Sequence, residues 1–128
     1  MSEVARAADP TTFGISPVLY VQDLEGTVRL LCSLLGMQVR FQLGDLAHLG
    51  CTIWNGQGGL EVKRTPGPVA PATISVDVGV LVDPLCEAAL AAGLSESTAP
   101  EDMPWVRRTF TLVLPDGHRL AVSGPVRV

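Results

Sequence analysis

The fold of this chain is decided by residues 15–37, ISPVLYVQDLEGTVRLLCSLLGM. Residues 15–21 are rich in β-branched, aliphatic and aromatic side chains, which predicts a short buried strand. Asp23 then suits a helix N-cap, because its carboxylate accepts hydrogen bonds from N–H groups that the first turn leaves unpaired. Gly36 ends the predicted helix, since glycine adopts the left-handed C-cap conformation without strain. The predicted apolar face of this helix consists of Leu24, Val28, Leu31 and Leu35.

Three more strands are predicted after this helix, at 37–43, 46–54 and 60–64. They are separated by Gly44-Asp45 and by the sequence NGQGG at 55–59. Both separators supply the residue types that tight turns need at positive φ, so antiparallel hairpins are expected.

The same order of elements restarts after residues 65–71, TPGPVAP, which break regular structure and predict a linker. A strand is predicted at 73–78. Asp83-Pro84 predicts a helix start, a capping residue followed by proline at the first helical position, and Gly93 ends this helix. Its predicted apolar face consists of Leu85, Ala88, Ala89 and Ala92, and further strands are predicted at 94–98, 107–114 and 118–123, with a turn at 115–117. The simplest interpretation is an internal β-α-β-β-β repeat of just under 60 residues, an α+β fold.

Composition narrows the class of protein. The chain has 128 residues, enough for one domain, with 47% hydrophobic and 17% charged residues and a net charge of −4. Its nine Lys and Arg residues are dispersed, so nucleic acid is not expected as a partner.

No apolar run reaches the ~20 residues needed to cross a bilayer, and residues 1–14 are expected to form an arm. The odd number of cysteines, three, predicts free thiols in a reducing, cytoplasmic compartment.

Two motifs resemble the glyoxalase, bleomycin-resistance and dioxygenase superfamily, also called the vicinal-oxygen-chelate superfamily. PVLYVQDL at 17–24, followed by LLGM at 34–37, resembles the opening of its first module, and LPDGHRL at 114–120 resembles a motif near the end of its second. The resemblance implies one domain at 15–123, with module one at 15–64 and module two at 72–123. It also implies that the sheets curl around a cleft, that the helices lie outside, and that the chain forms a homodimer. The chain departs from the pattern at Leu30-Leu31, where an aromatic pair is common, and at Leu114, where an aspartate is usual.

Catalytic members of this superfamily hold a divalent metal ion with four side chains, so the resemblance also assigns four positions here. They fall on Ser16, on Thr73 or Pro71, on Glu61 and on Ala121. Only Glu61 is a good ligand, and a lone carboxylate cannot offset partial dehydration of the cation. The prediction is a chain without metal or other cofactor.

The two histidines, His48 and His118, fall on none of these positions. His118 lies in a turn and is expected to be solvated. His48 alternates with apolar neighbours and is expected to be a hydrogen-bonded histidine in the wall of a sheet. No cysteine has the basic neighbours that activate a nucleophile. Glu61 is left with two interpretations, a buried general base or a carboxylate at the rim of the sheet.

What remains is a concave apolar surface, the usual character of a small-molecule site. Trp54 and Trp105 lie at strand ends, where each either stacks on a flat ligand or fills a sheet edge or a dimer seam. Residues 53–56 and 108–110 are similar to a phenazine-antibiotic resistance protein of the same superfamily, which implies that Trp54 stacks on the ligand. The other predicted ligand contacts are the apolar residues Met37, Phe41 and Met103 and the cations Arg40, Arg107 and Arg108.

The predicted function is therefore metal-free sequestration of a planar aromatic molecule, such as an antibiotic or a secondary metabolite, without catalysis. Two alternatives stay open at this point. One is a divergent metal-dependent isomerase, lyase or dioxygenase that uses Glu61, and the other is a structural or regulatory dimer with a vestigial cleft.

Overall fold

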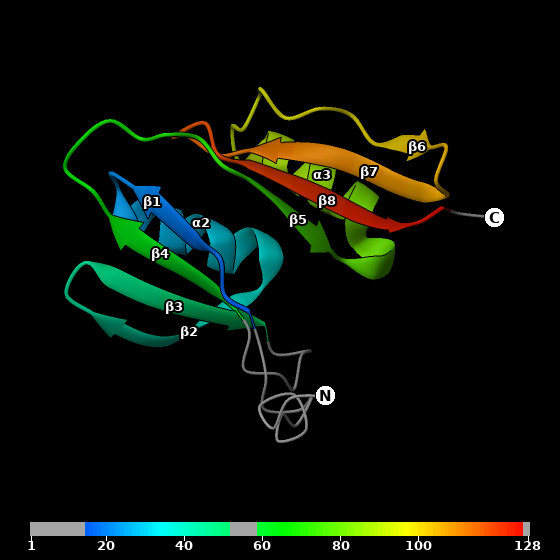
Figure 1. Cartoon of the computed structure of the whole chain (residues 1–128). Coiled ribbons are helices and arrows are strands. Elements are labelled where there is room, and N and C mark those ends of the chain that lie inside the picture. The colour runs from blue at the N-terminus through cyan, green and yellow to red at the C-terminus, as the bar shows by residue number, and fades with distance from the viewer. Residues whose placement is uncertain (1–14, 52–58, 127–128) are drawn as a thin grey trace, which may run out of the picture. The chain divides into compact units, whose positions relative to one another are not determined.

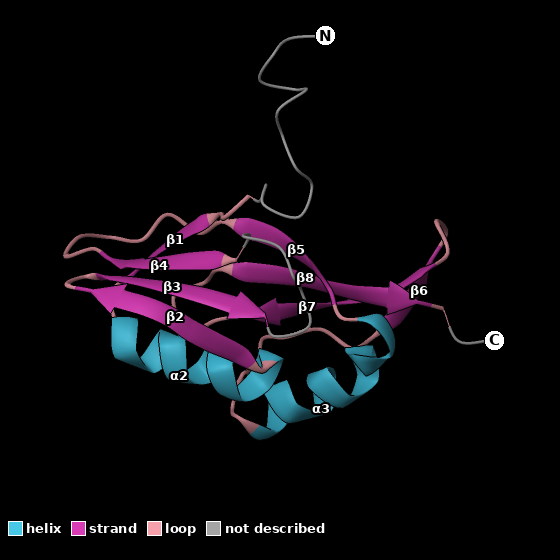
Figure 2. Cartoon of the chain, turned by 90° about the horizontal axis from the view of Figure 1, so that it is seen from below, coloured by secondary structure: helices cyan, strands magenta, loops and turns pink. Residues whose placement is uncertain are grey.

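The computed structural model describes residues 15–51 and 59–126. The chain divides into two compact units, Met1–Gly67 and Pro68–Val128, and the boundary lies inside the predicted linker at 65–71 (Figure 1). The described part of each unit contains one open four-stranded mixed sheet with an α-helix on one face (Figure 2). The predicted α+β class is confirmed. The predicted arm at 1–14 lies outside the described residues.

Unit 1 has the predicted order of elements: β1 (Val18–Val21), α2 (Leu24–Leu35), β2 (Met37–Leu43), β3 (Leu46–Cys51) and β4 (Leu60–Arg64). In the sheet the order is β1-β4-β3-β2, with β1 parallel to β4 and the other pairs antiparallel. Asp23 caps α2 as predicted, because its Oδ1 accepts from the Gly26 N–H at 3.0 Å. Gly36 ends α2 at a φ of 65°.

The core of unit 1 lies between α2 and one face of this sheet. The buried residues alternate along each strand, as the period of two requires. They are Leu19, Val21, Ala47, Leu49, Leu60 and Val62 from the strands and Leu24, Val28 and Leu31 from the helix. The opposite face of the sheet, here called the open face of unit 1, carries the alternate residues.

Unit 2 contains β5 (Thr73–Asp77), the 3₁₀ turn η1 (Gly79–Leu81), α3 (Val82–Ala91), β6 (Glu101–Met103), β7 (Arg107–Val113) and β8 (Arg119–Pro125). Its sheet has the order β5-β8-β7-β6, with β5 parallel to β8. The core is built by Phe110, Leu112, Leu120 and Val122 from the strands and by Val82, Cys86 and Ala89 from α3. Gly93 ends the α3 segment at a φ of 89°, as predicted.

The start of α3 differs from the prediction. The helix begins at Val82, directly after η1, and Asp83 lies inside its first turn instead of capping it. The Asp83 carboxylate accepts hydrogen bonds from the Arg108 guanidinium at 2.7 and 3.2 Å, and this long-range pair takes the place of a local cap. The buried face of α3 is consequently Val82, Cys86 and Ala89, and the predicted positions Ala88 and Ala92 are exposed.

The strand predicted at 94–98 is also wrong, because the second strand of this module is β6 at Glu101–Met103. Residues Ser97 and Thr98 still run beside β7. Their hydroxyls accept from the N–H groups of Val113 and Thr111 at 3.0 and 2.8 Å, so side chains replace part of a backbone ladder.

His118 is not solvated, contrary to the expectation from its place in a turn. Its side chain is 1% exposed, and its Nδ1 accepts a hydrogen bond from the Ala72 N–H at 3.0 Å. The ring therefore ties the turn between β7 and β8 to the residue that precedes β5. Only a ring nitrogen without a proton accepts, so the neutral form of His118 makes this contact.

Candidate functional site

The candidate site is the open face of unit 1, where one row of side chains crosses all four strands. The strand register places Val18 beside Glu61, Glu61 beside His48, and His48 beside Phe41. The rings of Phe41 and His48 stack in parallel, with centroids 5.2 Å apart and an angle of 5° between their planes. The His48 ring is buried at 8% exposure, whereas Phe41 is 50% exposed. His48 is therefore the covered ring of the stack, and Phe41 is the ring that a ligand can reach.

Glu61 and His48 form a close pair of polar groups on this face. The His48 Nδ1 lies 3.6 Å from the Glu61 Oε1, slightly beyond hydrogen-bond range. Within the described part of the chain this Nδ1 is a buried atom with no hydrogen-bond partner. His48 lies in a strand of the sheet as expected, but among the described residues the expected hydrogen bond is absent at Nδ1. Glu61 is partly exposed on an interior strand, so the rim interpretation of its position is wrong.

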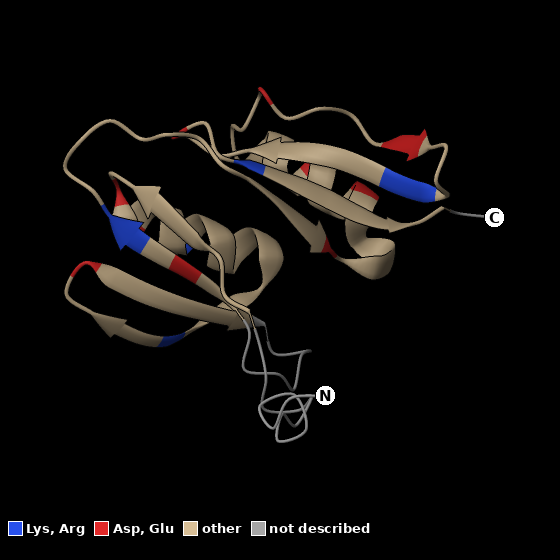
Figure 3. Ribbon diagram, in the orientation of Figure 1, with Lys and Arg blue, Asp and Glu red and all other residues tan. Residues whose placement is uncertain are grey.

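The next row of the open face consists of Tyr20, Lys63, Leu46 and Leu43, so it is apolar except for the exposed Lys63. Tyr20 and Leu43 belong to the next row and are 50% and 77% exposed, and Val18 is 39% exposed. The strands of unit 1 carry few charged side chains (Figure 3). The sequence analysis did not select Tyr20, Val18 or Leu43, although the alternation of β1 with its buried residues Leu19 and Val21 already placed Tyr20 and Val18 on the opposite face.

The metal-ligand positions implied by the superfamily do not fit a divalent cation here. In the two sheets, Val18 pairs with Glu61 and Ser75 pairs with Ala121, so the equivalent of Ser16 in unit 2 is Thr73 and not Pro71. The four positions then offer two hydroxyls, one carboxylate and one methyl group, which is a poor donor set. Across residues 15–51 and 59–126, no group of three or more His, Cys, Asp or Glu residues is placed to hold a metal ion.

The predicted ligand contacts divide between the two units. Met37, Arg40 and Phe41 belong to unit 1, and Trp54 lies outside the described residues. Unit 2 holds the remaining four: Met103, Trp105, Arg107 and Arg108. Trp105 is 65% exposed in the turn before β7, next to Val106, which has the unusual φ of 62°. That all eight residues meet one ligand stays a prediction.

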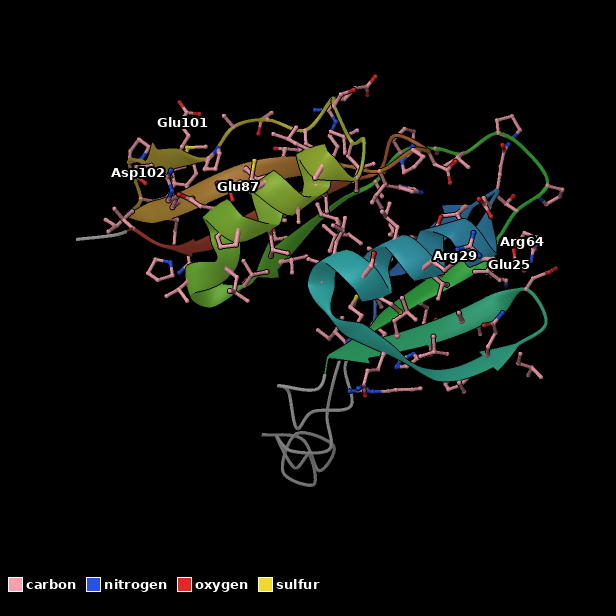
Figure 4. All side chains as sticks on the ribbon, turned by 180° about the vertical axis from the view of Figure 1, so that it is seen from behind. Glu25, Arg29, Arg64, Glu87, Glu101 and Asp102 are labelled. Atoms are coloured by element: carbon pink, nitrogen blue, oxygen red, sulfur yellow. The ribbon has the colours of Figure 1, made fainter. Side chains whose placement is uncertain are left out.

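Arg107 and Arg108 point to opposite faces of the sheet and bind carboxylates of the protein itself. Arg107 Nη2 donates to Asp77 Oδ2 at 2.8 Å, and Arg108 donates to Asp83 and to Asp102 of β6. Hydrogen bonds from Arg108 to Asp83 and then to Asp102 raise the pKa of the guanidinium further above its usual range. In unit 1, Arg64 is engaged similarly by Glu25, which lies beside it in Figure 4, and by Asp45.

Asp77 gives unit 2 a pH-dependent contribution to stability. The Gly79 N–H, and after it the Arg107 guanidinium, hold the pKa of Asp77 below its usual 3.8. A lowered folded-state pKa means that the ionised carboxylate stabilises the fold above the unfolded pKa and that this contribution disappears as pH falls through the folded pKa. We expect Asp77→Asn to be less stable than the parent at neutral pH and to lose less stability between neutral pH and pH values below 3.8.

The measurement is the urea midpoint as a function of pH. Glu87→Gln, at an exposed position of α3 (Figure 4), is the control for removing one negative charge. If Asp77→Asn lost as much stability as the parent protein on acidification, the assignment of this pH dependence to Asp77 would be contradicted.

Comparison with known proteins establishes the fold. Neither a scan against models of known protein families nor a search of curated protein sequences finds a match. Solved structures do match along nearly the whole chain. A bleomycin-binding protein in complex with bleomycin is 20% identical, with 88% of this chain and 98% of that chain covered and a TM-score of 0.68.

Two proteins with other activities match equally well. The fosfomycin resistance protein FosX from Listeria monocytogenes is 15% identical, with coverages of 88% and 92% and a TM-score of 0.71. Lactoylglutathione lyase from Agrobacterium tumefaciens is 16% identical, with coverages of 86% and 91% and a TM-score of 0.69. The chain therefore has the glyoxalase and bleomycin-resistance fold that its motifs predicted. At these identities the likeness extends to the fold alone. Among the described helices, none is long and apolar enough to span a membrane.

Proposed function

We propose that this protein binds a planar aromatic small molecule, such as an antibiotic or a secondary metabolite, without a metal ion and without catalysing a reaction on it. The observation that carries the proposal is the parallel stack of Phe41 on His48 at the open face of unit 1. A flat ligand adds a further ring to this stack, and the neighbouring Tyr20 and Val18 supply apolar surface.

The poor metal-ligand set favours binding over metal-dependent catalysis, and the proteins of this fold include a bleomycin-binding protein that holds its ligand in the solved complex. Trp54 and a second copy of the chain stay part of the proposal as predicted contributors to the site. The alternative, a divergent metal-dependent enzyme, is supported by the likeness to lactoylglutathione lyase and by the closeness of His48 to Glu61.

The first test is intrinsic tryptophan fluorescence of the purified protein, titrated with phenazine, acridine and anthraquinone derivatives with and without EDTA. The proposal expects saturable quenching that EDTA leaves unchanged. Stoichiometric metal in the purified protein, with ligand binding that EDTA abolishes, would overturn it in favour of the enzyme.

Phe41→Ala is expected to weaken ligand binding about tenfold. An aromatic pair contributes roughly 0.5–1.5 kcal/mol beyond its buried area, to which the lost apolar contact adds, and 1.4 kcal/mol is a tenfold change in Kd. The measurement is the Kd by isothermal titration calorimetry. Val39→Ala is a matched control, because Val39 is partly exposed on the same strand but pairs with Leu49 on the helix-covered face. Equal affinities of Phe41→Ala and the parent protein would place the ligand elsewhere.

A further inference from the structure

Arg40 owes its position to an irregularity in the pairing of β2 with β3. Val39 lies opposite Leu49, and Phe41 lies opposite His48, so Arg40 is an extra residue inserted in β2 at this bulge. Such a bulge re-aims the side chain of the inserted residue and often occurs beside functional sites. Regular alternation would have sent Arg40 and Phe41 to opposite faces of the sheet.

The space for the Arg40 guanidinium is provided by Gly50. Gly50 is buried and follows Leu49, which points to the helix-covered face. Because successive residues of a strand point to opposite faces, Gly50 belongs to the open face, as His48 does. A Cβ atom at Gly50 would overlap Nε, Cζ and Nη2 of Arg40. The guanidinium therefore lies over the Gly50 backbone, in the place that any other side chain would fill.

The guanidinium and the aromatic stack are consequently neighbours on one face. His48 and Gly50 are two residues apart on β3, a distance of about 7 Å along a strand. A ligand with two or three fused rings that stacks on Phe41 reaches the space over Gly50 with a substituent at its edge. Glu61 lies on the far side of His48 from Phe41, which directs a negatively charged substituent toward the Arg40 end of the row.

The chemistry of the Arg40 guanidinium indicates which kind of substituent on the ligand it binds. Its planar fork of N–H donors matches a carboxylate with two parallel hydrogen bonds, and charge-assisted bonds of this kind are about twice as strong as neutral ones. The other two predicted cations, Arg107 and Arg108, belong to unit 2 and not to this face.

We infer that the ligand is a planar aromatic acid, with its rings on Phe41 and its carboxylate bound by the Arg40 guanidinium over Gly50. This inference rests on the proposed function and adds the chemical class of the ligand and the residue that selects it. Arg40 acts here as a specificity-determining residue, and His48 and Gly50 position the two groups that contact the ligand.

The test compares two probes of the same shape, anthracene-2-carboxylic acid and anthracene-2-carboxamide, by isothermal titration calorimetry on the full chain. The parent protein is expected to bind the acid about tenfold more tightly than the amide, the difference that one charge-assisted pair provides. Arg40→Met keeps the apolar stem and is expected to remove this preference, because it lowers the affinity for the acid much more than the affinity for the amide. Arg40→Lys is expected to retain part of the preference.

Arg29→Met is the matched control, because Arg29 is exposed on α2 and its loss changes the net charge equally. Thermal melting of each variant checks that the fold is intact. A preference for the acid that survives Arg40→Met, or a parent protein that binds both probes equally, would overturn the inference and leave the proposed function standing. A parent protein that binds neither probe, nor any compound of the fluorescence panel, would overturn the proposed function itself.

Discussion

His118→Ala is expected to lower the free energy of unfolding by about 3 kcal/mol, since large-to-small substitutions in a core typically cost 2–5 kcal/mol. The His118 ring is 1% exposed, so its removal leaves a cavity beneath the turn between β7 and β8. The same change removes the acceptor of the Ala72 N–H, and a buried donor without a partner costs about 1–3 kcal/mol. Urea denaturation followed by circular dichroism measures the difference.

His118→Asn separates these two causes. The asparagine side-chain oxygen offers an acceptor near the position of the histidine Nδ1, so we expect it to restore about half of the lost stability. If the alanine variant were as stable as the parent protein, the contact between His118 and Ala72 would not hold the start of β5. If alanine and asparagine were equally destabilising, cavity formation alone would account for the loss.

Gly124→Ala is the second substitution with a large expected effect, a loss of about 3 kcal/mol at the upper end of the usual cost of overpacking. A Cβ atom at Gly124 would overlap the carbonyl oxygen of Gly79 and come within 3.0 Å of Val82 Cγ2. The first of these neighbours is backbone, so η1 must shift as a whole. That shift would strain the hydrogen bond from the Val78 N–H to the Ser123 carbonyl, which is 2.9 Å long, and the start of α3 that follows η1.

Gly67→Ala is the matched control, because a Cβ atom there meets no heavy atom within 4 Å and its φ is not in the left-handed region. We expect its free energy of unfolding to stay within about 0.5 kcal/mol of the parent value or to rise slightly, since alanine restricts the unfolded chain. The measurement is again the urea midpoint. Equal stability of the two glycine variants would contradict the close approach of η1 to β8.

Where a local signal was strong, the sequence predicted the elements closely. Asp23 and Gly36 bracket α2 at the predicted residues, and the strands at 37–43 and 60–64 have their predicted bounds. The errors fall where a distant partner competes with a local signal. Asp83 has the chemistry of a helix cap, but its carboxylate binds Arg108 of β7, and the helix begins at Val82, two residues before the predicted start at Pro84.

The candidate site was only partly predictable for a related reason. Phe41 and Arg40 were selected by residue type, whereas the importance of His48 depends on two other strands, β2 with Phe41 and β4 with Glu61. Nothing in the residues around His118 indicates burial, because the group that covers its nitrogen, the Ala72 N–H, lies 46 residues away.

The sequence by itself determined the two-module α+β fold and the first helix with its cap and stop. These follow from periodicity, capping chemistry and side-chain type, which are properties of residues close together in the chain. Only the tertiary structure decided that Arg40 is an inserted residue lying over Gly50, that Phe41 stacks on His48, and that His118 is buried. Strand register and long-range hydrogen bonds fix these features, and both depend on residues that meet only when the sheets form.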